Sequence, residues 1–237
     1  MGEMPELPEV ETTVRLLRPD LIGRHFGAVC LSWPRHSPQA AELCALLPGR
    51  RVTDVCRRGK YVVLELEPAD RILLLHLGMS GRLVVCQAQS PADDHAHTVL
   101  GLDNGWELRF LDPRKFGRVL FVSDPQLFLG RLGPEPLSNQ FTVKWLSSGL
   151  GGRKRAIIPA QLEQGLVAGL GNIYADEALH RAGINPCRSA ASLTQDELGA
   201  LCSGIRSVLT EAIEHQGTSF DWVFPHGSMQ DRLRVYG

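Results

Sequence analysis

The sequence predicts an α+β protein with a mainly β first domain and a mainly helical second domain. Short apolar runs separated by turn residues repeat between residues 60 and 122, which is typical of an antiparallel sandwich or barrel. Beyond residue 150 the apolar residues recur at helical spacing instead. The segment Leu132–Pro136 contains two prolines and a glycine, so we place the boundary there, with domains at residues 1–133 and 134–237.

The first domain is expected to open with a helix over residues 8–18. Val10, Val14 and Leu17 fall on one face of that helix, and we expect Pro19 and Gly23 to end it. Strands are expected at residues 60–66, 72–77, 82–86, 98–102, 107–111 and 118–122, with the Asn104-Gly105 pair as the hairpin turn between the fourth and the fifth.

The second domain is expected to consist of helices. A short helix is predicted over residues 156–164, and another over residues 173–181 with Asn172 as its N-cap. Thr194 and Glu197 have the spacing of a capping box, which predicts the start of a long amphipathic helix.

Composition excludes several classes of protein. The 237 residues carry 25 Lys and Arg against 26 Asp and Glu, a formal net charge of -1, so the chain is not uniformly basic as many nucleic-acid binders are. A local basic stripe remains compatible with that total. The six cysteines include no C-x-x-C pair, which argues against a zinc ribbon and favours reduced thiols in a cytoplasmic protein. No signal peptide or membrane-spanning segment is predicted.

The opening residues offer a candidate nucleophile. If Met4 is the initiator, its removal gives Pro5 a free secondary amine, which can attack a sugar carbon and form an iminium. Glu6 beside it is placed to donate or shuttle a proton. The alternative is an ordinary helix N-terminus whose acidic residues favour the helix dipole.

Two basic segments and a glycine-rich turn offer phosphate contacts. Lys60 follows the cationic run Arg50–Gly59, in which only Asp54 is acidic, so Lys60 could serve as a general acid or a phosphate ligand. Residues 165–174 place three glycines before a helix N-terminus, just after Arg153–Arg155, which favours backbone contacts to an anion. A solvated basic turn and a tight turn between helices are the alternatives.

Two turns of the predicted sheet carry candidate wedges for a base stack. Met79 lies between Gly78 and Gly81, and Arg114 and Phe116 lie on a turn between two strands. Exposed apolar side chains can insert between base pairs, and an arginine can bond an unpaired base. The alternatives are a methionine that fills a gap in the core and a phenylalanine that folds back into it.

Taken together and in this order, these segments resemble the formamidopyrimidine-DNA glycosylase family, bifunctional base-excision enzymes that remove oxidised purines such as oxoguanine and formamidopyrimidines and also cleave abasic sites. The resemblance implies a two-layered antiparallel β-sandwich with flanking helices, joined to a helical helix–two-turns–helix domain. It also implies a bacterial, cytoplasmic, nucleoid-associated monomer whose partner is damaged double-stranded DNA. The segments that carry the resemblance are residues 4–11, 58–61, 76–81, 112–117, 132–137 and 169–177.

The resemblance assigns roles to single residues. Pro5 would form the Schiff base, Glu6 would be the proton donor beside it, and Lys60 would donate a proton during β-elimination. Six residues would bind DNA. Three would fill the gap left by the flipped base, with Arg114 facing the estranged cytosine: Met79, Arg114 and Phe116. The other three would contact the DNA backbone: His95, Arg153 and Asn172.

The sequence departs from the family pattern at several positions. Most members carry a four-cysteine zinc finger after the segment that matches residues 235–237, where this sequence stops, so we expect no cofactor in this chain and weakened DNA binding. Met1–Glu3 would block Pro5 unless Met4 is the start. Residues 217–237, which match the segment containing the loop that closes over the flipped base, are fewer than usual, and Ile158 stands where lysine is common.

Other functions remain open at this point. An endonuclease VIII-like glycosylase acting on oxidised pyrimidines generally has glycine where this sequence has Leu7, which favours the purine enzyme. A catalytically impaired lesion-DNA-binding protein is the other candidate, because Pro5 is preceded by four residues. In either case we expect the basic residues to gather on one DNA-facing surface, which would reconcile a net charge of -1 with a nucleic-acid partner.

Overall fold

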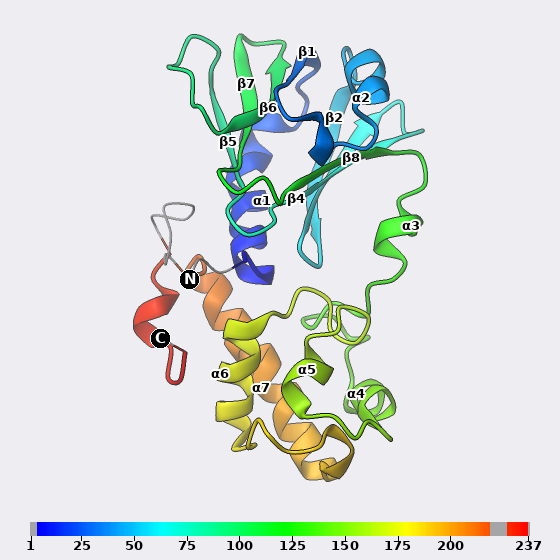
Figure 1. Cartoon of the computed structure of the whole chain (residues 1–237), viewed down its shortest axis with the longest axis vertical. Helices are drawn as coiled ribbons and strands as arrows, with labels where there is room; N and C mark the ends of the chain where they lie inside the picture. Colours follow the sequence, from blue (N-terminus) through cyan, green and yellow to red (C-terminus); the bar gives the residue numbers. More distant parts are fainter. Residues whose placement is uncertain (1–3, 219–226, 237) are drawn as a thin grey trace. The chain divides into compact units, whose positions relative to one another are not determined.

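The computed structural model describes residues 4–218 and 227–236, which divide into two compact units. The first unit contains Met4, Pro5 and Val10–Pro125 (Figure 1). The second contains the residues from Gln126 onwards together with Glu6–Glu9, which include the start of the first helix. The domain boundary predicted between residues 133 and 134 stays a prediction.

The first unit is built on two four-stranded antiparallel sheets, in the orders β1-β6-β7-β5 and β2-β3-β4-β8 (Figure 1). This confirms the predicted two-layered sandwich. The six strands predicted from the sequence are all present, within two residues of their expected ends. The bounds are β1 Phe26–Leu31, β2 Arg51–Arg58, β3 Tyr61–Glu67, β4 Ile72–His76, β5 Arg82–Gln87, β6 Ala96–Leu102, β7 Trp106–Leu111 and β8 Arg118–Val122.

The two strands that the sequence did not reveal, β1 and β2, each lie at one edge of their sheet; the opposite edges, β5 and β8, were predicted. An edge strand forms a ladder on one side only and exposes much of its surface, so its apolar alternation is weak. In β2 only Val52 and Val55 are fully buried, and the rest of the strand is polar or cysteine. The basic residues of β2 therefore had the appearance of a turn.

Two helices accompany these sheets, α1 (Leu7–Leu21) and α2 (Ala40–Leu46). The predicted inward face of α1 is confirmed, because Val10 and Val14 are buried in the core. Of the two residues expected to end α1, Pro19 does not, since the helix continues to Leu21, whereas Gly23 lies just beyond its end. Proline removes a single N–H here, close to the C-terminus, and Gly23 at φ +84° then stops the helix.

The second unit is helical. The resemblance implied such a domain, and its longest helices, α6 and α7, pack against each other. Ala178, Leu201 and Ile205 belong to one continuous apolar core. The helices are α3 Gln126–Leu129, α4 Val143–Leu150, α5 Ile157–Gln161, α6 Asn172–Ala182 and α7 Gln195–Glu214.

The helix ends in this unit test the predicted caps. The capping box at Thr194 is present at the start of α7. Asn172 is the first residue of α6 and not its N-cap; Gly171 takes the cap position in extended backbone. The predicted short helix over residues 156–164 covers only Ile157–Gln161. Helix α4 was not predicted, although Thr142 caps it by accepting the Trp145 N–H at 3.1 Å.

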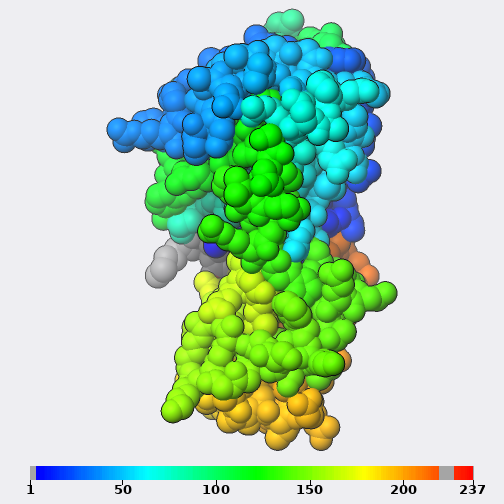
Figure 2. All heavy atoms as spheres, turned by 90° about the vertical axis from the view of Figure 1, so that its right-hand side faces the viewer, coloured from blue at the N-terminus to red at the C-terminus, as the bar shows by residue number. Residues whose placement is uncertain are grey.

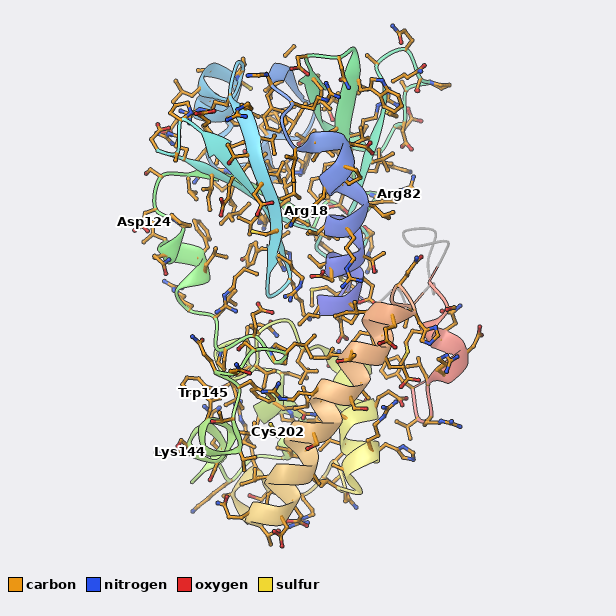
Figure 3. All side chains as sticks on the ribbon, turned by 180° about the vertical axis from the view of Figure 1, so that it is seen from behind. Arg18, Arg82, Asp124, Lys144, Trp145 and Cys202 are labelled. Carbon is orange, nitrogen blue, oxygen red and sulfur yellow. The ribbon has the colours of Figure 1, made fainter. Side chains whose placement is uncertain are left out.

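Trp145 on α4 and Cys202 on α7 contact other parts of the second unit (Figure 3 labels both). The indole N–H of Trp145 donates to the carbonyl of Leu166 at 2.9 Å, which ties α4 to the chain ahead of α6. Cys202 is buried in the apolar core on α7. Like the other five cysteines it is a free thiol, as the sequence predicted.

Residues 4–218 and 227–236 contain neither a membrane-spanning helix nor a metal-binding cluster. None of their helices combines the length and apolar character needed to cross a membrane. They also contain no group of three or more His, Cys, Asp or Glu side chains arranged to hold a metal ion.

The capping box predicts a measurable stability effect. Thr194 Oγ1 accepts the Glu197 N–H at 3.2 Å, and the Glu197 carboxylate accepts the Thr194 N–H at 2.8 Å. We expect Thr194→Ala to lower the free energy of unfolding by about 1 kcal/mol, because one N–H donor of the first turn loses its acceptor. Thr194→Ser retains the hydroxyl and serves as the control. Equal denaturation midpoints for both variants would contradict this role.

Candidate active site

The carboxylate of Glu6 lies at the N-terminus of α6. Its Oε2 accepts the Gly171 N–H at 2.7 Å and its Oε1 accepts the Ile173 N–H at 2.9 Å. The side chain is 3% exposed. Free N–H groups and the helix dipole both favour the negative charge of a carboxylate at this end of a helix. The glycine-rich turn expected to bind a phosphate therefore binds a carboxylate of the chain itself.

Glycine is required where this carboxylate approaches the backbone. A Cβ on Gly171 would lie 2.3 Å from Cδ of Glu6, which no relaxation of a side chain held at both oxygens relieves. A Cβ on Gly169, whose φ is +84°, would lie 2.8 Å from Cβ of Leu7. The Leu7 N–H donates to the Gly169 carbonyl at 3.0 Å. The glycines thus serve a close contact between the start of α1 and the turn before α6.

A second buried carboxylate, Glu9, secures the same segment. Its Oε2 accepts the Glu6 N–H at 2.9 Å, and its Oε1 accepts the Tyr174 hydroxyl at 2.5 Å and the Thr218 N–H at 2.9 Å. Burial, followed by the charge of Glu9, raises the pKa of Tyr174 well above its usual value, so the hydroxyl remains a donor. Pro5 is bonded to Glu6 and is itself buried, so this network sets the position of its carbonyl end.

Lys60 occupies the turn between β2 and β3, after Gly59 with φ +56°. Its side chain is buried, with 7% exposed, and no described carboxylate lies within ion-pair distance of its ammonium. Burying an ammonium without a partner is costly. An anionic ligand would recover that cost, so Lys60 is a suitable phosphate or substrate contact.

Three arginines of this segment, Arg50, Arg51 and Arg57, are already paired. The expectation that only Asp54 offsets them is wrong, because their partners come from distant parts of the sequence. Asp54 itself pairs with Arg18, at 2.9 Å (Figure 3 labels Arg18 on α1). The remaining pairs are Arg50 with Asp70 at 2.6 Å, Arg51 with Glu67 at 2.6 Å and Arg57 with Glu11 at 3.1 Å.

His76, at the end of β4, is the titratable neighbour of Lys60. Its ring packs edge-on against Tyr61, with the centroids 5.0 Å apart, and its Nδ1 accepts the Gly78 N–H at 3.2 Å. Burial, followed by the charges of Lys60 and Arg118, lowers the pKa of His76 to about 4. The ring is therefore neutral at neutral pH, with its proton on Nε2.

The candidate wedge residues lie on two turns of the first unit. Phe116 is 53% exposed, so the alternative that it folds back into the core is wrong. Arg114 is exposed as well, and its guanidinium lies 5.6 Å from the centroid of the Phe116 ring. Met79 is half-buried. Their insertion into a base stack stays a prediction.

The three residues predicted to contact the DNA backbone differ in their surroundings. His95 is exposed just before β6, and Asn172 is exposed at the first position of α6. The guanidinium of Arg153 forms an ion pair with Glu163, which also binds Arg155. Hydrogen bonds from these two arginines lower the pKa of Glu163. The positive charge of Arg153 is therefore already paired with the carboxylate of Glu163.

Several features bear on the sequence predictions in other ways. Glu9, Tyr174 and Thr218 had no assigned role, because no local pattern reveals contacts between residues so far apart in the chain. Ile158 packs against the apolar core of the second unit. Most of the closing loop expected within residues 217–237 falls on residues 219–226, which lie outside the described residues.

Two family models match the chain. The formamidopyrimidine-DNA glycosylase N-terminal domain matches residues 4–119, and the formamidopyrimidine-DNA glycosylase H2TH domain matches residues 132–222. The chain belongs to the formamidopyrimidine-DNA glycosylase family. The helix–two-turns–helix domain that the resemblance implied is therefore confirmed.

Relatives of the whole chain carry the same name. Formamidopyrimidine-DNA glycosylase of Herpetosiphon aurantiacus is 46% identical, over 99% of this chain and 89% of the relative. That of Symbiobacterium thermophilum is also 46% identical, over 98% of this chain and 79% of the relative.

Solved structures of the family share the fold. The Lactococcus lactis enzyme, noncovalently bound to DNA with an abasic site, has a TM-score of 0.91 and 34% identity, covering 98% of this chain and 88% of that one. The Thermus thermophilus enzyme has a TM-score of 0.87 and 40% identity, covering 98% and 87%.

The depressed pKa of His76 predicts how stability depends on pH. The unfolded chain binds a proton at His76 near pH 6.5, whereas the folded chain does so only near pH 4. Its contribution is therefore complete above pH 6.5 and is lost as the pH falls towards 4, by an amount on the order of 3 kcal/mol. His76→Gln keeps an acceptor for the Gly78 N–H and should flatten this dependence.

The control for this measurement is His180→Gln on the exposed face of α6. Urea denaturation at several pH values between 4 and 7 supplies the comparison. A pH dependence in His76→Gln as steep as that of the parent chain would show that His76 does not titrate in this way.

Proposed function

We propose that this chain excises oxidised purines from double-stranded DNA and cleaves the resulting abasic site, with the amine of Pro5 as nucleophile. Membership in the formamidopyrimidine-DNA glycosylase family makes it a base-excision DNA glycosylase. The observation that carries the mechanism is the anchoring of Glu6, the residue bonded to Pro5, at the N-terminus of α6. An anchored nucleophile loses little freedom when it meets a sugar carbon.

The first half of the reaction forms a covalent intermediate. The ammonium of Pro5 gives a proton to the Glu6 carboxylate, and the resulting amine attacks C1′ of the damaged nucleotide. The bond between C1′ and the base breaks, and the departing base takes up a proton. The C1′–O4′ bond of the sugar then breaks: the nitrogen of Pro5 gives up its remaining proton, O4′ gains one through Glu6, and C1′ is left doubly bonded to that nitrogen as an iminium. Glu6 acts in these steps as a proton shuttle, which accepts a proton before it donates one.

The second half cleaves the strand. The iminium acidifies C2′, which loses a proton, and the 3′ phosphate leaves with the electrons of its C–O bond. Lys60 would donate the proton needed in this step. Its buried ammonium has no described carboxylate beside it, so the anionic strand would become its partner.

Recognition requires the damaged base to leave the helix. Met79, Arg114 and Phe116 would fill the gap, with Arg114 facing the estranged cytosine, and would offset the cost of unstacking. His95, Arg153 and Asn172 would bind the backbone. We place the enzyme as a monomer in the bacterial cytoplasm, associated with the nucleoid through DNA.

The family's zinc finger has no counterpart in the described residues, whose side chains form no cluster suited to a metal ion. No step of the mechanism above passes through zinc. The match to the family begins at Met4, which supports Met4 as the start and Pro5 as the mature N-terminus.

Borohydride trapping tests the nucleophile. A chain that begins at Pro5 should form a covalent adduct with an oxoguanine duplex, whereas a chain that retains Met1–Met4 should trap at least about 100-fold less, because its proline nitrogen is an amide. Excision of oxoguanine and thymine glycol, measured side by side, separates the purine enzyme from an endonuclease VIII-like one. A chain starting at Pro5 that binds lesion DNA but forms no adduct would establish the non-catalytic alternative.

The ion pairs of Glu163 predict a gain in DNA binding. In Glu163→Gln the guanidinium groups of Arg153 and Arg155 lose their carboxylate partner and become available to phosphates. We expect tighter duplex binding at low salt and a steeper fall of affinity with salt, by about one unit of slope for each new phosphate contact. Glu211→Gln, which frees Arg181 and Arg232, is the matched control. An unchanged salt slope in Glu163→Gln would remove Arg153 from the DNA contacts.

A further inference from the structure

The two turns that carry the wedge residues are joined by a buried carboxylate that the mechanism does not use. Asp112 follows β7 and is 0% exposed. Its Oδ1 accepts the hydroxyl of Ser80, from the turn that carries Met79, at 2.7 Å. Its Oδ2 accepts the N–H of Gly117, at the end of the turn that carries Phe116, at 2.7 Å. A single carboxylate thus links both turns.

Ser80 also links Asp112 to the backbone of Arg114. A hydroxyl has one proton, and Ser80 donates it to Asp112, so its oxygen is free to accept the Arg114 N–H at 3.2 Å. The backbone of Asp112 holds the same turn, since its carbonyl accepts the Lys115 N–H at 3.1 Å. The backbone on both sides of Phe116 is therefore tied, directly or through Ser80, to one buried side chain.

Close packing of the two turns reinforces these hydrogen bonds. A Cβ on Gly78 would lie 2.7 Å from the backbone at both Phe116 and Gly117, so the turns touch backbone to backbone there. Gly78 also has φ +65°, which favours glycine. A Cβ on Gly117 would lie 2.3 Å from the ring of Phe110, so this ring packs directly against the backbone of the second turn.

The neighbouring surface holds the second turn from its other side. The ammonium of Lys115, a residue with φ +60°, lies 4.4 Å from the ring centroid of Trp33. Figure 2 shows the blue and the bright green parts of the first unit together on one face. Arg114, Lys115 and Phe116 are all exposed on this turn, and Lys115 is the one directed to Trp33.

We propose that Asp112 and Ser80 are positioning residues that join the Met79 turn and the Arg114–Phe116 turn into one rigid wedge. The inference rests on the proposed function, in which these side chains fill the space of the flipped base. Loose turns would have to be ordered at the moment of insertion, and that entropic cost would weaken the competition with base stacking. A joined pair is ordered before DNA binds. Asp112 therefore acts on base opening and not on the amine chemistry of Pro5.

The test uses Ser80→Ala and Asp112→Asn in the full chain with Pro5 free. Each removes a hydrogen-bonding partner from a buried group, so we expect about a 10-fold slower single-turnover excision of oxoguanine. A fluorescent 2-aminopurine beside the lesion should report slower or smaller unstacking by the same factor. In a Phe116→Ala background the two substitutions should have a smaller further effect, because the most exposed side chain that the joined turns position is already gone.

Ser37→Ala is the matched control, because Ser37 is a buried serine of the same unit whose hydroxyl has no hydrogen-bond partner among the described residues. It should excise and unstack like the parent chain. Hydrogen exchange at the Arg114 amide gives a readout that needs no activity: Ser80→Ala should accelerate it several-fold, and Ser37→Ala should not.

The outcomes separate this inference from the proposed function. If the parent chain traps and excises but Ser80→Ala and Asp112→Asn slow excision equally with and without Phe116, the joined wedge is wrong and the glycosylase stands. If the parent chain forms no adduct, the proposed function is wrong. Unchanged exchange at the Arg114 amide in Ser80→Ala would overturn the joining of the turns in either case.

Discussion

Glu6 places a buried carboxylate against the first free N–H groups of α6, and the surrounding sequence is arranged to allow that contact. Gly171 leaves room for the side chain, and Glu9 holds the Glu6 backbone while it binds Tyr174 and Thr218. Burying two carboxylates is costly unless their oxygens are satisfied. Here each receives several donors, so the start of the chain is fixed next to the residue proposed to react.

The pairing of charged side chains says more about this protein's attraction for phosphate than its net charge does. The net charge of -1 conceals many arginines that already have acidic partners, among them Arg50, Arg57 and Arg153. Such pairs position loops and strands, but they reduce the attraction for phosphate. Lys60 differs, because it is buried without a described carboxylate partner. The electrostatic case for an anionic ligand at the proposed catalytic site therefore rests on a single ammonium group.

Local patterns in the sequence predicted local structure well. Strands β3 to β8, the capping box at Thr194 and the inward face of α1 follow from apolar spacing and turn chemistry, and all are present. The failures involve what a local pattern does not contain. The edge strand β2 is too polar to be recognised, and the partners of its arginines lie far away in the sequence. For the same reason Asp112 was noted only as part of a turn, although it joins two turns.

Peptide mapping of the borohydride-reduced adduct tests the central claim most directly, because two buried amines compete for the role of nucleophile. A chain that begins at Pro5 would be trapped on an oxoguanine duplex and digested, and the modified peptide would be sequenced by mass spectrometry. The account predicts the sugar remnant on the nitrogen of Pro5. A remnant on the side chain of Lys60 would contradict it.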